Sequence, residues 1–182
     1  MQSPMPHTAI DPANRESRQS RLAHGGLIQG VDLWPLTRHE DDRGSFMEVF
    51  QEHWGSAIKP VQWSAVGSEP RVFRGMHLHW RHDEYIMVVS GHASVGLRDA
   101  RPESPTFGVW SLYELYGEQP AALTFPQGII HGWYTHEPTL HLQAVSEAYV
   151  DYHPEDNIGV RFDDPDLGIP WSDPDPILSE RA

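Results

Sequence analysis

The chain has 182 residues, which is enough for one domain with a sizeable core and too few for two comfortable ones. It carries 13 Lys and Arg residues against 26 Asp and Glu residues, a net charge of −13 with histidine neutral, so neither nucleic acid nor an anionic membrane is expected as a partner. Because the chain contains no cysteine, disulfides, thiolate metal sites and cysteine nucleophiles are excluded.

The first residues differ in composition and hydrophobic pattern from the rest of the chain. Residues 1–24 mix Ser, Pro, Arg, Gln and Asn without periodicity and predict a flexible N-terminal tail, followed by a single domain over residues 25–182. The tail has no apolar run long enough for a signal peptide or a membrane span. A cytoplasmic protein is therefore expected.

Short apolar runs rich in β-branched and aromatic residues begin at Leu27 and are separated by Gly, Pro and charged residues. They predict strands, in chain order, at 27–36, 46–50, 61–66, 72–79, 85–89, 93–97, 109–115, 121–125, 129–135 and 140–150. Short helices are expected only at 48–54 and after Pro154. Many short strands at close spacing predict an all-β sandwich or jelly-roll barrel, and residues 153–182, crowded with Asp and Pro, predict an irregular extension packed on it.

The most informative segment contains His77 and His79, two residues apart in a predicted strand. Side chains at this spacing point to the same face, so both imidazoles should enter one space. Glu84 opens the next strand and can direct a carboxylate into that space. His131 follows a proline–glycine turn at the start of a later strand, whereas His82 lies in the turn before Glu84 and is expected to be solvated.

These residues match the two motifs of the cupin superfamily. The first motif is a His-x-His pair, a glutamate and, after six residues, Gly91; the second is Pro-x-Gly-x-x-His, ending at His131. The resemblance implies a double-stranded β-helix barrel with a divalent metal, and it implies no organic cofactor. The implied ligands are His77, His79, Glu84 and His131, a set that suits Fe(II), Mn(II), Ni(II) or Zn(II).

A second resemblance covers roughly residues 27–179. Residues 42–50 resemble the opening signature of the dTDP-4-dehydrorhamnose 3,5-epimerases, and Gln62 with residues 72–77 resembles their central signature at the preserved spacing. Further matches lie at 99–101, 104–108, 131–133, 152–154, 163–171 and 177–179. The resemblance implies proton exchange beside the ketone of a nucleotide-linked keto-sugar, with His77 as general base. It also implies a grip on the nucleotide diphosphate and sugar by Arg43, Phe46, Glu48, Gln62 and Arg74.

The chain departs from this family at its chemical groups. His79 stands where the family has glutamine, and Glu84 stands where it has the lysine that stabilises the enolate. Ser146 stands where the family has the tyrosine that acts as general acid. The aspartate that orients the base would fall beyond Ala182. Two of these changes supply metal ligands, so we expect a metal-assisted reaction in which His77 becomes a ligand and in which Tyr149 and Tyr152 are the candidate acid–base groups.

Three functions remain open on the sequence. The chain is expected to be a sugar-nucleotide isomerase or epimerase, because the family motifs span it. The alternatives are a metal cupin of other chemistry, such as an Fe(II) oxygenase or an isomerase of a small substrate, and a non-catalytic sugar-nucleotide-binding protein. By the same resemblance, a homodimer is expected in which the strand at 27–36 joins the partner's sheet.

Overall fold

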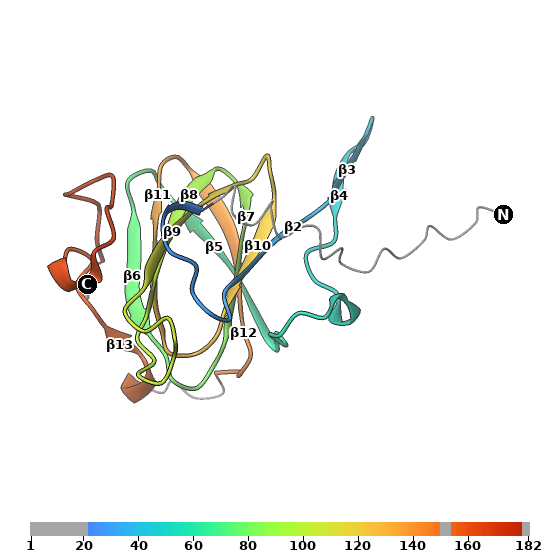
Figure 1. The fold of residues 1–182 in the computed structure, drawn as a ribbon. Helices are drawn as coiled ribbons and strands as arrows, with labels where there is room; N and C mark the ends of the chain where they lie inside the picture. Colours follow the sequence, from blue (N-terminus) through green and yellow to red (C-terminus); the bar gives the residue numbers. More distant parts are fainter. Residues whose placement is uncertain (1–21, 150–153, 180–182) are drawn as a thin grey trace.

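The structure is a computed structural model, and it describes residues 22–149 and 154–179 (Figure 1). These residues form strands and a few short 3₁₀ helices. In chain order the elements are β1 (Leu22–Gly25), β2 (Asp32–Pro35), β3 (Arg38–Asp41), β4 (Gly44–Met47), η2 (Glu52–Trp54), β5 (Gln62–Ser68), β6 (Phe73–Leu78), β7 (Glu84–Ser90), β8 (His92–Asp99), β9 (Trp110–Tyr116), β10 (Ala121–Phe125), β11 (Ile129–Thr135), β12 (Thr139–Val145), η3 (Pro154–Asp156), β13 (Ile158–Gly159) and η4 (Pro165–Leu167). No helix in the described part of the chain combines the length and the apolar character that a membrane crossing requires.

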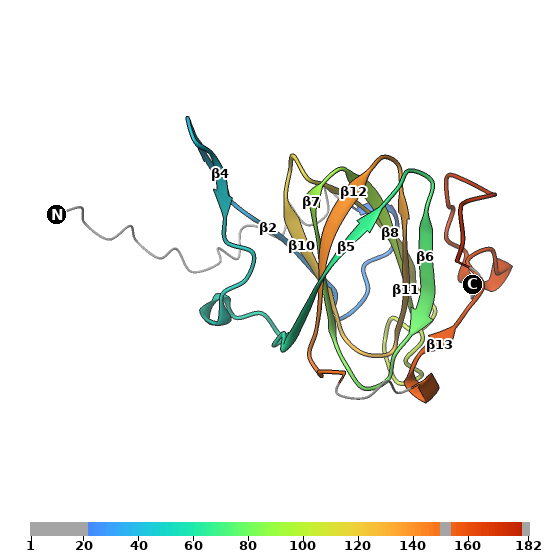
Figure 2. The same ribbon diagram turned by 180° about the vertical axis from the view of Figure 1, so that it is seen from behind.

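Two antiparallel sheets form the barrel. One has the strand order β1-β9-β8-β11-β6-β13 and the other β2-β10-β7-β12-β5, and they lie face to face in Figures 1 and 2. Leu33 and Leu123 from the second sheet meet Val95 and Leu115 from the first in one buried core cluster. Alternate residues of each strand face this core, because side chains in a strand point to opposite faces in turn. The predicted all-β jelly-roll barrel is confirmed.

Two predicted strands, 121–125 and 129–135, coincide with β10 and β11. The predicted strand 140–150 ends earlier, at Val145, where the chain turns to contact the segment before β7. The helix expected at 48–54 is a single 3₁₀ turn, Glu52–Trp54. The apolar pattern therefore located these elements well and their ends less well.

The N-terminal strands pair within the chain. Strand β1 begins at Leu22, inside the segment 1–24 predicted as a tail, and pairs with β9; residues 1–21 lie outside the described residues. The segment 27–36, predicted to be one strand, is strand only at Asp32–Pro35, and this β2 pairs with β10 of the same chain.

A hairpin of β3 and β4 was missed by the sequence analysis apart from part of β4. It projects away from the barrel in both ribbon views, and almost all of its residues are exposed. Hydrophobic alternation marks a strand only when one face is buried. Only the base of this arm meets the barrel, through Met47 and Arg38, and the rest of it has no buried face, so its sequence carries no such pattern.

The C-terminal segment lies along the outer face of the six-stranded sheet (Figure 1, orange to red). Its β13 pairs with β6, and Leu167 and Ile169 are buried against Phe73 and Tyr134 of the barrel. The predicted irregular extension, with η3 and η4 as its only helical turns in the described residues, is thus an outer layer that covers one side of the barrel.

Strands β6 and β11 approach closely at Gly75 and Gly132. Gly75 has φ +118°, and a Cβ there would lie 2.6 Å from the Gly132 Cα. A side chain at this position would push the two strands apart. The close approach matters because the same strand pair sets His77 opposite His131.

A buried carboxylate stabilises the loop between β8 and β9. Asp99 Oδ1 accepts hydrogen bonds from the backbone N–H and the Nε of Arg101, at 3.0 and 2.8 Å. Its Oδ2 accepts from the hydroxyls of Ser104 at 2.6 Å and Thr106 at 2.7 Å. Burial raises the pKa of Asp99, but these hydrogen bonds outweigh it and hold the pKa below its usual range.

Asp99→Asn should therefore lower the free energy of unfolding by about 2–4 kcal/mol at neutral pH, because charge-assisted hydrogen bonds are lost and the Arg101 charge loses its partner. Since the pKa of Asp99 is lower in the folded than in the unfolded state, the ionised carboxylate stabilises the fold above about pH 4 and loses this effect below it. Urea unfolding should show a difference between wild type and variant that shrinks in acid. A difference below ~0.5 kcal/mol at neutral pH, the range of an ordinary surface substitution, would contradict this.

Candidate active site

The four residues predicted as metal ligands lie together at one end of the barrel. Glu84, the first residue of β7, is buried, and its Oε1 lies 3.4 Å from His131 Nε2 and 3.7 Å from His79 Nε2. One ring nitrogen each of His77, His79 and His131 lies within 4.8 Å of the others. The pairing of β6 with β11 places His77 opposite His131, and the residue just past the end of β6 is His79.

Backbone carbonyls orient two of these imidazoles. His79 Nδ1 lies 2.9 Å from the Asp156 carbonyl oxygen, and His131 Nδ1 lies 3.0 Å from that of Ile129. A carbonyl only accepts, so each Nδ1–H donates and each Nε2 keeps its lone pair. His131 Nε2 is buried and has no hydrogen-bond partner. Metal-binding histidines are held in this way, which makes the donor set suitable for a divalent ion.

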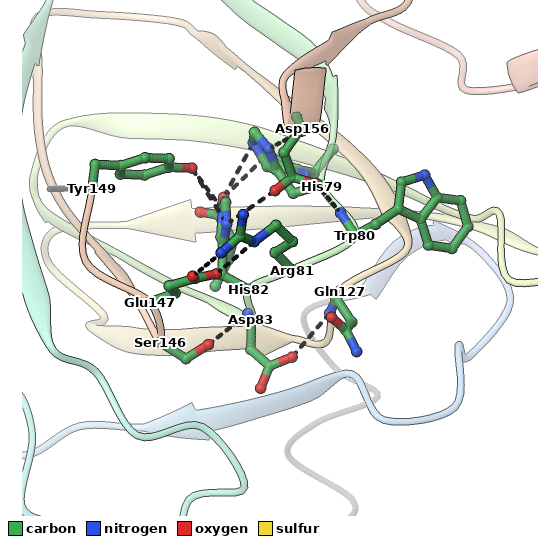
Figure 3. A network of polar contacts seen from close by, with 12 residues as sticks. His79, Trp80, Arg81, His82, Asp83, Gln127, Ser146, Glu147, Tyr149 and Asp156 are labelled. Atoms are coloured by element: carbon green, nitrogen blue, oxygen red, sulfur yellow. Dashed lines mark hydrogen bonds and ion pairs between the residues drawn. The ribbon is translucent and has the colours of Figure 1, made fainter. Parts of the chain in front are cut away.

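His82 is not solvated, and that expectation is wrong. Its side chain is 2% exposed, and its Nε2 lies 3.3 Å from Glu84 Oε1. Figure 3 shows the Tyr149 hydroxyl pointing at the same imidazole, 2.9 Å from Nε2. Its Nδ1 lies 3.6 Å from Asp156 Oδ2. The cluster therefore contains one histidine more than the sequence analysis assigned to it.

Contacts with distant segments turn the loop before β7 inward (Figure 3). The Asp83 N–H donates to Ser146 Oγ at 2.8 Å, and the Asp83 carboxylate accepts from the Gln127 N–H at 3.0 Å. The Trp80 N–H donates to Asp156 Oδ1 at 2.9 Å. Ser146 thus anchors this loop.

Two pockets open on the histidines. The smaller, of about 250 Å³, is lined by five of the predicted site residues, Gln62, His77, His79, Glu84 and Tyr149. The larger, of about 810 Å³, is lined by Arg74 and His77, among others. His77 lines both pockets, so a molecule in either one can reach its imidazole.

The protonation states at this site suit both proton abstraction and metal binding. Burial lowers the pKa of His77 to about 4, and burial together with His131 lowers the pKa of His79. Burial raises the pKa of Glu84, but the neighbouring imidazole of His131 and hydrogen bonds from His82 and Gln143 bring it down to about 2. At neutral pH the imidazoles of His77 and His79 are neutral and the Glu84 carboxylate is ionised.

The predicted nucleotide grip is not assembled as a whole. Arg74 lines the larger pocket, where its Nε donates to Ser68 Oγ at 3.0 Å. Arg43 and Phe46 lie on the β3–β4 arm, exposed and away from both pockets, and Glu48 directly after the arm is also exposed (Figure 2). Arg43 forms an ion pair with Asp41.

The structure describes one of the two candidate acid–base tyrosines, Tyr149. Tyr149 lines the smaller pocket and contacts His82, and its backbone N–H donates to Gln62 Oε1 at 2.9 Å. Tyr152 lies outside the described residues.

The sequence analysis overlooked two further residues at Glu84. Gln143 donates to Glu84 Oε2 at 2.7 Å, and Asp156 contacts both His79 and His82. Gln143 is a polar residue at an inward-facing position of a predicted strand, and a polar side chain at such a position could have indicated a site residue. Asp156 lies in the irregular extension, where only the folded chain brings it to the site.

Comparisons with known proteins agree with this architecture. The family model described as dTDP-4-dehydrorhamnose 3,5-epimerase matches residues 26–182. The spore coat polysaccharide biosynthesis protein SpsL of Bacillus subtilis is 32% identical over 154 residues, 80% of this chain and 97% of that protein. The dTDP-4-dehydrorhamnose 3,5-epimerase of Methanothermobacter thermautotrophicus is 32% identical over 146 residues, 73% of this chain and 74% of the relative.

Solved structures give the same result. The Bacillus anthracis dTDP-4-dehydrorhamnose 3,5-epimerase with TDP and PPi bound superposes with a TM-score of 0.77 at 29% identity, covering 88% of this chain and 95% of that one. The Legionella pneumophila epimerase in complex with dTDP-4-keto-L-rhamnose has a TM-score of 0.75 at 27% identity, covering 86% and 89%. The predicted family is confirmed: this chain belongs to the dTDP-4-dehydrorhamnose 3,5-epimerase family.

Proposed function

We propose that the chain is an isomerase or epimerase that exchanges protons beside the ketone of a nucleotide-diphospho-keto-sugar, with a bound divalent ion. The observation that carries this proposal is the position of His77, the family's base, where the two pockets meet and where a neutral imidazole can accept a proton. Membership of the family supports the substrate class. The relatives' names and bound ligands point to a dTDP-sugar.

Three acceptor atoms support the proposed ion. The Nε2 atoms of His79 and His131 lie 3.7 and 3.4 Å from Glu84 Oε1, and each ring already uses its Nδ1 in a contact with a backbone carbonyl. A cation between the three atoms would bind all of them. Fe(II), Mn(II), Ni(II) and Zn(II) all accept such ligands. A divalent ion held by these residues would supply Lewis-acid stabilisation of an enolate, the task that the resemblance gives to the lysine at the position of Glu84.

The chain's own residues would then divide the remaining work. His77 removes the proton from the carbon beside the ketone. The Tyr149 hydroxyl, which borders the smaller pocket, is the candidate proton donor on the other side, and Tyr152 is retained as a second candidate. Arg74 and Gln62 line the pockets in which the diphosphate and the sugar would lie.

We also propose that two copies assemble. Arg43 and Phe46 line neither pocket of their own chain, and the arm that carries them projects from the barrel (Figure 1), so they would grip the nucleotide from a neighbouring subunit. Sedimentation analysis should give the mass of a homodimer. A monomer at micromolar concentration with full activity would contradict this assignment.

Arg74→Ala should raise KM for the sugar nucleotide about 10–100-fold with a smaller effect on kcat, since a hydrogen bond to a charged group contributes ~1.5–3 kcal/mol. The side chain is exposed and bonds only to Ser68 and to the Gly67 carbonyl among the contacts in the described residues, so the fold should be retained. Arg74→Lys should recover part of the loss, because lysine keeps the charge without the bidentate geometry. An unchanged KM would remove Arg74 from the grip.

The reaction class is tested with dTDP-4-dehydrorhamnose in deuterated buffer. Proton NMR should show loss of the signals at the carbons beside the ketone when the protein is added. Oxygen uptake without such exchange would support the oxygenase instead, and binding with neither would support a sugar-nucleotide-binding protein.

A further inference from the structure

Three imidazoles approach Glu84 Oε1 with Nε2. His82 Nε2 also lies 2.9 Å from the Tyr149 hydroxyl, so it would bind an ion only with its ring proton on Nδ1, towards Asp156. The Nε2 atoms of His82, His131 and His79 lie 3.3, 3.4 and 3.7 Å from Glu84 Oε1. On the opposite side each ring meets an oxygen. His79 and His131 donate from Nδ1 to backbone carbonyls, and His82 Nδ1 lies 3.6 Å from the Asp156 carboxylate.

The three separations from Glu84 Oε1 fit a single ion, although His77 also has a ring nitrogen within 4.8 Å of those of His79 and His131. Bonds of about 2.0–2.2 Å at angles near ~90–110° place the ligand atoms of one ion roughly 3.0–3.5 Å apart, close to the distances from Glu84 Oε1. A carboxylate behind the Nδ1 of a metal-binding histidine is also a common way to orient the ring. One ring nitrogen each of His79 and His82 and one oxygen of Glu84 lie within 4.8 Å of one another, and all three residues are buried.

His77 is placed differently. Within the described residues, no ion-pair contact of 4 Å or less joins it to Glu84, in contrast to His79, His82 and His131. His77 also lines both substrate-sized pockets, and His82 lines neither.

We infer that His79, His82, His131 and Glu84 hold the ion, and that His77 stays outside this set with its imidazole directed to the substrate. This set differs from the one implied by the cupin motif, in which His77 takes the place here given to His82. With this ligand set, the chain can combine a metal site with a free His77 imidazole, the general base implied by the family. The role of His77 rests on the proposed function, but the ligand set does not.

Cobalt binding separates the two ligand sets. Protein purified without nickel resin and stripped with a chelator should bind Co²⁺ with visible absorption bands. His82→Asn should weaken the affinity, measured by competition with a chromophoric chelator, by more than ~100-fold and should change the bands, because loss of a ligand exceeds the ~10–100-fold effect of an outer partner. The matched variant His77→Asn should bind within ~3-fold of wild type with the same bands.

A measurement on the wild type guards against misfolding of His82→Asn. In protein with ¹⁵N-labelled histidine, zinc should shift the Nε2 resonances of His79, His82 and His131 and leave that of His77 near its metal-free position. Equal loss of cobalt in both variants, zinc coordination by His77, or no metal binding by wild type would overturn the inference. Because neither measurement uses a sugar, failure of the epimerase proposal would leave an intact ligand set recognisable.

Discussion

Glu84→Gln should lower the protein's affinity for a divalent ion more than ~100-fold while the barrel stays folded. The carboxylate is 2% exposed and is the only anionic oxygen to which the Nε2 atoms of His79, His82 and His131 all point in the described residues. The variant keeps the shape and the bond from Gln143 but replaces the charged ligand with a weak neutral one. Isothermal titration with Zn²⁺ against the stripped protein measures the loss, which should exceed that of an outer-sphere change.

Glu114→Gln is the matched control. Glu114 also lies beside two imidazoles, His92 and His136, but on β9 and away from both pockets. Its replacement should leave the high-affinity ion in place. If Glu114→Gln lost the ion and Glu84→Gln kept it, the ion would belong to this outer cluster and the account of the pocket would be wrong.

His77→Asn should lower the rate of proton exchange about 10²–10⁴-fold, the usual contribution of a positioned general base. The lowered pKa of His77, about 4, keeps its imidazole neutral at the pH of the assay, and asparagine has no comparable basicity. The loss should fall on kcat, because the diphosphate is held by other residues. The measurement is deuterium incorporation into dTDP-4-dehydrorhamnose at saturating and limiting concentrations.

The control for this prediction is metal content, which should equal that of wild type if His77 lies outside the ligand set. A rate within ~10-fold of wild type would exclude His77 as base, since a general base contributes more than that. Tyr149→Phe in parallel tests the proton donor. It should lower the exchange rate less than His77→Asn if Tyr152 shares the role.

The barrel could be predicted because its strands bury one face. The strands at 121–125 and 129–135 are dense in β-branched and aromatic residues, and their bounds match β10 and β11. The β3–β4 arm could not be predicted in full, since Arg38–Asp41 is polar and mostly exposed, and its pairing depends on the turn at residues 42–43.

The site was predictable where neighbours in sequence share a face, as with His77 and His79. The inward position of His82 was not, because it depends on contacts across the fold: Asp83 with Ser146, and His82 itself with Asp156. The neighbours of His82 in the chain, Trp80 and Asp83, are themselves held by Asp156 and Ser146, which lie far away in the sequence.

The central claim is that this chain joins the family's proton exchange to a bound ion. The direct test compares deuterium incorporation into dTDP-4-dehydrorhamnose by stripped wild-type protein with incorporation after one equivalent of Zn²⁺, Mn²⁺, Ni²⁺ or Fe²⁺ is restored. We expect exchange beside the ketone that is lost on stripping and returns with at least one of these ions. Equal exchange with and without metal, or none under any condition, would contradict it.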